Sequence, residues 1–258
     1  MHFPSFTLGT AALVLSGLLA ATTVQAQEIR VTITNLATAD GGNLLTPFWV
    51  GLHNGEFDVY DTDTAASPSL ERLAEDGNTG PLSEDFLNSA AAAQGATLAS
   101  PDGPLAPGAQ ATMTFVLAGG AAANGYLSYA SMFIPSNDAF VGNDDPLAHP
   151  LFDADGNFVG ADIVITGAQV RDAGTEVNDE VPGNTAALEQ AAPDTGESEG
   201  GTIQPHAGFT EGGNILAAIP NGDFTVAGFQ VARIVVELAS DTPTAVAAQA
   251  WGQVKSRF

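Results

Sequence analysis

Short runs of alternating apolar and polar residues, separated by clusters of Gly, Pro, Asn and Asp, constrain the fold of this chain more than any other feature. In the clearest run, Ile29, Val31 and Ile33 alternate with charged and hydroxyl-bearing neighbours. A period of two is typical of a strand with one buried face. The candidate strands cover 28–34, 110–117, 126–134, 162–166 and 224–238. Together they predict a mostly β fold, a single antiparallel β-sandwich with long loops.

Helix signals are few and short. Ser67 followed by Pro68 supplies an N-cap and a preorganised first helical position, and Gly77 supplies the end of the helix. The apolar face of this helix carries Leu70, Leu73 and Ala74, and its polar face carries Glu71, Arg72, Glu75 and Asp76. A second short helix is predicted over 81–93.

The stretch from Asn178 to Gly213 is polar and rich in Asp, Glu, Pro and Gly. A segment of this length inside a domain is usually functional or mobile, or it divides two domains. The run from Phe224 to Leu238 has too few neighbours to form a sheet alone, so we expect it to return to the earlier strands. We therefore predict one domain over 27–240, followed by a tail over 241–258.

The first 26 residues have the pattern of a secretory signal peptide. Every residue from Leu8 to Ala21 is apolar or small, and the segment ends in a small-x-small step at 24–26. A membrane anchor would need about 20 apolar residues, and Thr22 interrupts the run too early for that. No later segment is long and apolar enough to span a bilayer. We expect a secreted or periplasmic protein, and the absence of cysteine together with a single lysine suggests a bacterial one.

The chain carries 30 acidic against 6 basic side chains, a formal charge of −24. Such a chain would repel phosphates, which argues against nucleic acid as a partner. Because cysteine is absent, disulfides, thiolate metal sites and a cysteine nucleophile are excluded. The acidity itself has a simpler interpretation as a solubilising surface.

Sequence motifs of catalysis are missing, so we predict that the protein is not an enzyme. There is no G-x-S-x-G elbow, no phosphate-binding Gly loop with a Lys, and no H-E-x-x-H. His53, His149 and His206 are isolated from one another. The alternative is a secreted carboxylate-based hydrolase acting on polysaccharide, which would need two carboxyl groups across a groove and a sugar-stacking Trp49 or Trp251. Core packing is the simpler role for those tryptophans.

Two oxygen-rich segments each follow a candidate strand, so both are expected near the ends of the sandwich. The first comprises 136–138 and 143–145, and the second comprises 172–176 and 178–180. Calcium prefers about six to eight oxygen ligands, and clustered carboxylates repel one another unless a cation neutralises them. A solvated acidic loop explains the same pattern. A third acidic segment, 153–157, has its Gly in the wrong position for an EF-hand and is interpreted as a hairpin turn between Phe152 and Phe158.

Four segments resemble the spondin N-terminal domain family known from F-spondin and mindin. Residues 131–142, SMFIPSNDAFVG, resemble its "MxxPSPDWxVG" segment, and residues 172–176, DAGTE, resemble its "DAGTDSG" motif. Residues 231–237, VARIVVE, resemble its closing "ARVVIER" strand, and residues 73–77, LAEDG, resemble its "QLAELG" helix end. They occur in the family order and span nearly the whole chain after residue 26.

The resemblance implies a C2-like sandwich of about eight strands with Ca²⁺ held at one end by loop carboxylates. Carried over to this chain, the metal ligands fall on Asp138, Asp172 and Glu176. The family has Asp where this chain has Glu176, and its Trp is replaced by Ala139-Phe140. The implied function is an exported calcium-binding module for extracellular binding or cell adhesion, with an unknown protein or glycan partner.

Overall fold

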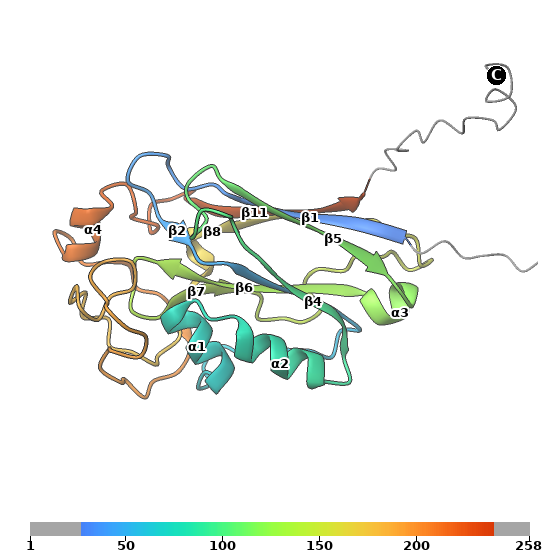
Figure 1. Cartoon of the computed structure of the whole chain (residues 1–258), viewed down its shortest axis with the longest axis horizontal. Helices are drawn as coiled ribbons and strands as arrows, with labels where there is room; N and C mark the ends of the chain where they lie inside the picture. Colours follow the sequence, from blue (N-terminus) through green and yellow to red (C-terminus); the bar gives the residue numbers. More distant parts are fainter. Residues whose placement is uncertain (1–26, 240–258) are drawn as a thin grey trace, which may run out of the picture.

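The computed structural model describes residues 27–239 and contains two antiparallel sheets packed face to face, which confirms the predicted β-sandwich (Figure 1). The first sheet has the strand order β5-β1-β11-β8. Its strands are β1 (Gln27–Asn35), β5 (Gln110–Leu117), β8 (Ala161–Thr166) and β11 (Gln230–Leu238). As predicted, the last strand returns to the early ones, since β11 lies between β1 and β8.

The second sheet has seven strands in the order β10-β9-β7-β6-β3-β4, with β2 paired to β6. Its strands are β2 (Leu44–Leu45), β3 (Phe48–His53), β4 (Ala92–Leu98), β6 (Tyr126–Ile134), β7 (Ala139–Gly142), β9 (Val170–Asp172) and β10 (Gln204–Pro205). The main core lies between the two sheets and receives the inward residues of β1, Ile29, Val31 and Ile33.

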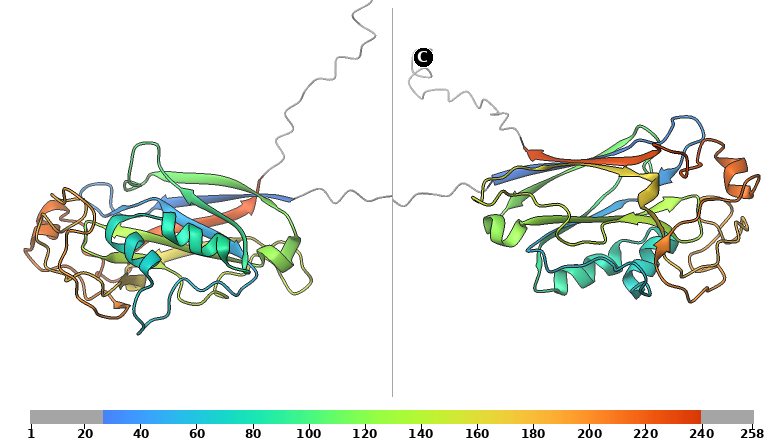
Figure 2. Two further views of the ribbon diagram at one scale, coloured as in Figure 1. Left: turned by 60° about the horizontal axis from the view of Figure 1, so that its bottom comes forward. Right: turned by 180° about the vertical axis from the view of Figure 1, so that it is seen from behind.

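Helices α1 (Pro68–Asp76) and α2 (Gly80–Asn88) cover the outer face of the second sheet (Figure 2). The predicted caps of α1 are confirmed: Leu70 N donates to Ser67 Oγ at 3.2 Å, and Gly77 adopts the left-handed conformation with φ 66°. The remaining helices are short, α3 (Gly120–Asn124) and α4 (Asn214–Ala218). None of the helices within 27–239 has the length and apolar character needed to traverse a bilayer.

A second hydrophobic layer between the helices and the sheet depends on two glycines. Gly51 of β3 and Gly95 of β4 face each other across the strand pair. A Cβ on Gly95 would lie 2.9 Å from the Phe86 ring, and a Cβ on Gly51 would lie 2.7 Å from the Trp49 ring. The missing side chains therefore leave room for Phe86, which packs edge-on against Trp49 at 5.2 Å and Phe57 at 4.8 Å between ring centroids. Trp49 is completely buried, as its predicted core role requires.

Three local predictions need correction. The helix expected over 81–93 ends at Asn88, because Ser89 is extended and the small residues from Ala92 onward pair with β3. The strand expected from Phe224 begins only at Gln230, because Phe224 turns into the core and packs against Phe133 at 5.3 Å. Glu75, expected on the polar face of α1, is buried.

The acidic segment 153–157 forms the predicted turn, with Phe152 bridged to Phe158 and Gly156 at φ 80°. The predicted signal peptide over 1–26, the predicted tail over 241–258 and Trp251 lie outside the described residues.

Truncation of Phe86 tests the layer between helices and sheet. Phe86→Ala should lower the free energy of unfolding by about 3–5 kcal/mol, because a fully buried ring leaves a cavity that its neighbours cannot fill. Leu87→Ala is the matched control, since Leu87 is the next residue and is 60% exposed; it should change stability by about 0.5 kcal/mol or less. Urea denaturation measures both, and equal effects would contradict this packing.

Candidate functional site

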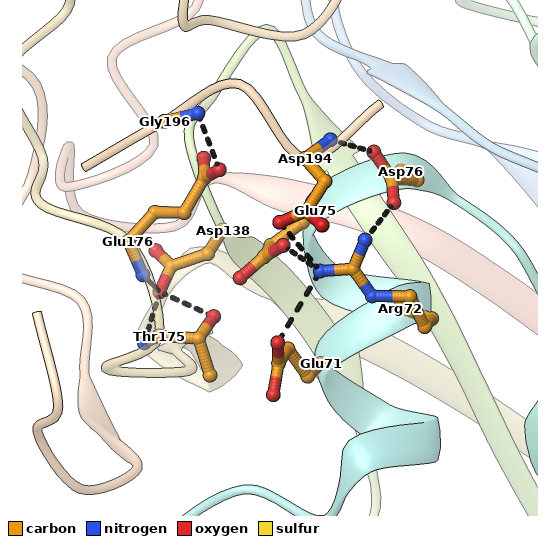
Figure 3. A network of polar contacts seen from close by, with 9 residues as sticks. All are labelled: Glu71, Arg72, Glu75, Asp76, Asp138, Thr175, Glu176, Asp194 and Gly196. Atoms are coloured by element: carbon orange, nitrogen blue, oxygen red, sulfur yellow. Dashed lines mark hydrogen bonds and ion pairs between the residues drawn. The ribbon is translucent and has the colours of Figure 1, made fainter. Parts of the chain in front are cut away.

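Two turns far apart in the sequence meet at one end of the sandwich. Asp138 lies between β6 and β7, and Thr175 and Glu176 follow β9. Strands β7 and β9 are paired, with Ala139 opposite Asp172, so the turns are neighbours. Asp138 Oδ2 accepts hydrogen bonds from Thr175 N at 2.8 Å, Thr175 Oγ1 at 3.2 Å and Glu176 N at 3.1 Å (Figure 3). The structure thus brings together two of the three predicted site residues, Asp138 and Glu176.

Asp172, the third predicted residue, holds the second turn in shape. Its Oδ1 accepts from Gly174 N and its Oδ2 from Asn178 Nδ2, both at 2.7 Å. Gly174 has φ 68°, and a Cβ there would lie 2.7 Å from Thr202 N, so only glycine fits the turn. Asp172 is close enough to raise the pKa of Asp138 by charge repulsion, but both of its oxygens accept hydrogen bonds within the turn.

Asp138 and Glu176 each retain one buried oxygen that accepts no hydrogen bond, Asp138 Oδ1 and Glu176 Oε2. Their residues are 0% and 3% exposed. The other Glu176 oxygen, Oε1, accepts from Gly196 N at 2.9 Å. A Cβ on Gly196 would overlap the Glu176 carboxylate, so a side chain at this position would displace the carboxylate from its present place.

The electrostatics of the pair are unfavourable for two negative charges. Burial raises the pKa of Asp138 to about 7, and the charge of Asp172 adds to the effect in spite of the hydrogen bonds from Thr175 and Glu176. Burial likewise raises the pKa of Glu176 to about 7, and the charge of Glu75 is the second cause. Near neutral pH these carboxyl groups either bind protons or need a positive partner.

Sequence reasoning missed one member of this cluster, Glu75 near the end of α1. Its residue is 2% exposed, and burial raises the pKa of its carboxyl group. Arg72, one turn earlier, forms an ion pair with Glu75 and a second with Asp76, where Arg72 Nη1 lies 2.7 Å from Asp76 Oδ2. Helical periodicity alone gives no signal for Glu75, because it places this residue among charged neighbours.

The other predicted polar residues are engaged elsewhere. Asn143 Nδ2 donates to Ser128 Oγ at 3.0 Å, and Asp144 accepts from Thr62 N and Thr62 Oγ1. His53 is buried beside Ser128, with 2.9 Å between His53 Nε2 and Ser128 Oγ. Over the part of the chain that the structure describes, no three His, Cys, Asp or Glu side chains form a ready-made metal cage.

A small cavity of about 170 Å³ opens beside the carboxylates. It is lined by Ala65, Ala66, Glu71, Gly174, Thr175, Ser198, Gly200 and Gly201. Thr175 both lines this cavity and donates to Asp138, whereas Asp138 and Glu176 themselves do not line it.

The donor chemistry of this site fits a hard cation. Unpaired carboxylate oxygens with mutual repulsion are the ligands that Ca²⁺ prefers, with backbone carbonyls and water completing its shell. A cation bound here would be held by Asp138 and Glu176, which have the free buried oxygens, and the charges of Asp172 and Glu75 lie close enough to raise their pKa values. A cation here would remove the repulsion described above.

Comparison with known proteins identifies one family. Residues 44–177, which are 134 of the 258 residues, match the family model described as Spondin_N. The match includes α1, both turns of the site and three of the four segments quoted above; the closing strand segment 231–237 lies beyond it. No curated protein matches the chain.

The raised pKa values predict how stability depends on pH. A carboxyl group whose pKa is higher in the folded than in the unfolded protein stabilises the fold at pH values below its unfolded pKa. This stabilisation is lost as the pH rises through the pKa of the folded protein. For Asp138 and Glu176 the interval runs from their ordinary values, 3.8 and 4.5, to about 7. We expect the protein in chelator to lose stability over that interval, as measured by urea unfolding.

Asp138→Asn should flatten this loss, because the amide does not titrate. The control Asp102→Asn removes an exposed carboxylate and should leave the slope unchanged. Equal slopes in the parent protein and in Asp138→Asn would contradict the assignment of the effect to this site.

Proposed function

The chain belongs to the Spondin_N family, and on this premise we propose that it is an exported, calcium-stabilised module that binds an extracellular protein or glycan and has no catalytic role. The family is typical of extracellular proteins, which supports a binding module outside the cell. The predicted signal peptide over 1–26 supports export, and the lack of cysteine supports a bacterial host. Adhesion is the form of binding that the resemblance to F-spondin and mindin suggests.

The observation that carries the calcium proposal is the pair of buried, unpartnered oxygens, Asp138 Oδ1 and Glu176 Oε2. A buried carboxylate without a positive partner is strongly unfavourable. Within 27–239 the ion pairs of Arg72 reach Glu71, Glu75, Asp76 and Asp194, and no ion pair reaches Asp138 or Glu176. When bound, Ca²⁺ would supply that missing positive charge.

Each residue would have a separate task at such a site. Asp138 and Glu176 would offer the free oxygens. Asp172 would fix the glycine turn and add negative charge close to Asp138. Gly196 would orient the Glu176 carboxylate through its backbone N–H. The longer Glu176 in place of the family's Asp is accommodated because position 196 has no side chain.

In the hydrolase alternative, Trp49 is one of the two tryptophans expected to stack on a sugar. Trp49 is completely buried between β3 and the helices, where it packs against Phe57 and Phe86, so it offers no face to a saccharide. A non-catalytic binding module is therefore the better-supported function.

Calcium binding has a direct thermodynamic test. Chelation should lower the Tm of the purified protein, and added calcium should restore it. At free calcium about 100 times the Kd, the folded state gains about 2.7 kcal/mol. Asp138→Asn and Asp172→Asn should each abolish the calcium-dependent shift in calorimetry, whereas Asp102→Asn should retain it. An unchanged shift in both site variants would defeat the ligand assignment.

Export can be tested on the full chain produced in a bacterial host. Mass spectrometry of the exported protein should show a mature N-terminus at Gln27, because the small-x-small step ends at Ala26. Ala26→Leu places a large side chain at the cleavage position and should block processing. Recovery of the parent protein with residues 1–26 still attached would refute the proposed signal peptide.

A further inference from the structure

Strand β8 is an outer strand of the first sheet and is hydrogen-bonded to β11 alone. On the other side of β11, Leu36 N donates to Val231 O at 2.9 Å, so the odd-numbered residues of β11 bond to β1. Alternate residues of an antiparallel strand bond to opposite sides. The even-numbered residues of β11 therefore bond to β8, where they lie opposite Ala161, Ile163 and Ile165.

This alternation leaves two residues of β8 with free backbone groups at the edge of the sheet. The N–H and C=O groups of Asp162 and Val164 point away from β11, and no hydrogen bond within 27–239 reaches them. The opposite edge of the same sheet is partly occupied, because Val116 O of β5 accepts from Gln94 Nε2 of β4 at 2.7 Å. The edge of β8 is thus a template on which a further strand can pair.

The open edge leads to a cavity of about 510 Å³. Thr166, the last residue of β8, lines this cavity together with Pro205 of β10, the outer strand of the second sheet. Residues 224–229, which precede β11, complete the wall. Both sheets therefore end at the cavity, whose volume lies in the range of about 300–1,000 Å³ that is typical of ligand sites.

The wall of the cavity is uncharged although the chain is strongly acidic. It contains no Asp, Glu, Lys or Arg, whereas the chain carries 30 acidic and 6 basic side chains. The one histidine in the wall, His206, has a pKa lowered by burial, so its ring is neutral at pH 7. Phe224, Phe229 and the 59% exposed Val226 supply apolar surface. An uncharged, apolar group is therefore the occupant that this wall fits.

The hydroxyl groups of the wall argue against a sugar as that occupant. Thr166 Oγ1 donates to Gln169 Oε1 at 3.2 Å, and Thr225 Oγ1 donates to Asp223 Oδ1 at 2.6 Å. Both hydroxyl protons are thus used within the protein, and the wall has no carboxylate or side-chain amide to orient a saccharide. An apolar side chain needs no such partners.

We propose that the edge of β8 and this cavity bind an extended peptide segment of an extracellular protein partner. The segment would pair with Asp162 and Val164 and place an uncharged apolar side chain in the cavity. In strand addition, main-chain hydrogen bonds supply affinity and pockets for side chains supply specificity. A second copy of this chain is a poor partner, because each copy carries a formal charge of −24. The inference rests on the binding role proposed above and narrows its partner to a peptide.

A phage-displayed library of random nine-residue peptides, selected on the purified exported chain, tests the site. The selected peptides should be rich in apolar residues and poor in Asp and Glu. Val164→Pro should weaken their binding at least tenfold, because it removes the free N–H at a position where the ladder to β11 uses none. Val164→Thr keeps that N–H and should stay within threefold of the parent protein. Fluorescence anisotropy of labelled synthetic peptides measures each affinity.

Filling the cavity is the second variant, and it does not alter the backbone of β8. Ala168 lines the cavity and is exposed, so Ala168→Trp should occupy part of the space without disturbing the core and should weaken binding at least tenfold. Ala154→Trp is the matched control, since Ala154 is exposed in the turn over 153–157; it should stay within twofold. Circular dichroism verifies that each variant is folded, and Ala168→Trp alone decides if Val164→Pro is not.

Three results would overturn the proposal: a library that yields no binding peptide, peptides that bind the folded site variants as tightly as the parent protein, and binding that appears only after residues 240–258 are removed. The last result would make a segment of this chain the occupant. None of them affects the calcium-dependent shift in Tm. Absence of that shift would overturn the calcium site and leave peptide binding measurable, so the two failures are distinguishable.

Discussion

The hydrogen bonds that Asp138 accepts from Thr175 and Glu176 determine the architecture of one whole end of this sandwich. They fasten the turn between β6 and β7 to the turn after β9, and in doing so they bring the carboxyl groups of Asp138 and Glu176 together inside the protein. The same contact that orders the turns therefore creates the electrostatic repulsion. Three neutral donors lower the pKa of Asp138, but burial raises it by more, so hydrogen bonding alone does not balance this end of the molecule.

Hydrophobic packing explains why the protein tolerates this arrangement. The buried face of α1 packs in one hydrophobic cluster with Phe140 and Ala173. Phe140 lies in β7, just after the turn of Asp138, and Ala173 follows β9, just before Thr175 and Glu176. Burial of that apolar face fixes the helix against both turns, and the helical geometry then leaves Glu75 pointing inward. The apolar surface that α1 buries contributes more favourable free energy in total than the burial of the Glu75 charge costs. The helix therefore docks in this position although it buries a carboxylate. Arg72 balances part of this charge, and the cation proposed above would balance more of it.

Strands whose two faces differ were predicted from their alternation, and of the two long strands buried on both faces the sequence predicted β6 but missed β3. Strands β1, β5 and β11 alternate because one side faces the core and the other faces solvent. Strand β3 has all six residues buried, since the first sheet covers one face and the helices cover the other, so its run FWVGLH has no period of two. The meeting of Asp138 with Glu176 followed from the family resemblance. Glu75 could not be predicted, because its burial depends on how α1 docks and not on its neighbours in the chain.

In the acidic loop after β9, residues 178–213, several carboxylates accept hydrogen bonds from backbone N–H groups. The buried Glu180 accepts from Thr210 N at 2.6 Å and Ile215 N at 3.2 Å, and Asp179 accepts from Val181 N at 2.9 Å. A segment with few apolar residues and little regular structure needs such acceptors, because otherwise its buried backbone donors would remain unpaired. These carboxylates therefore help to order the loop, and its middle reaches Glu176 through Gly196 N. Backbone hydrogen bonds join the same segments, from Val177 N to Glu197 O at 2.8 Å and from Glu199 N to Thr175 O at 2.9 Å, so the loop and the carboxylate site form a single structural unit.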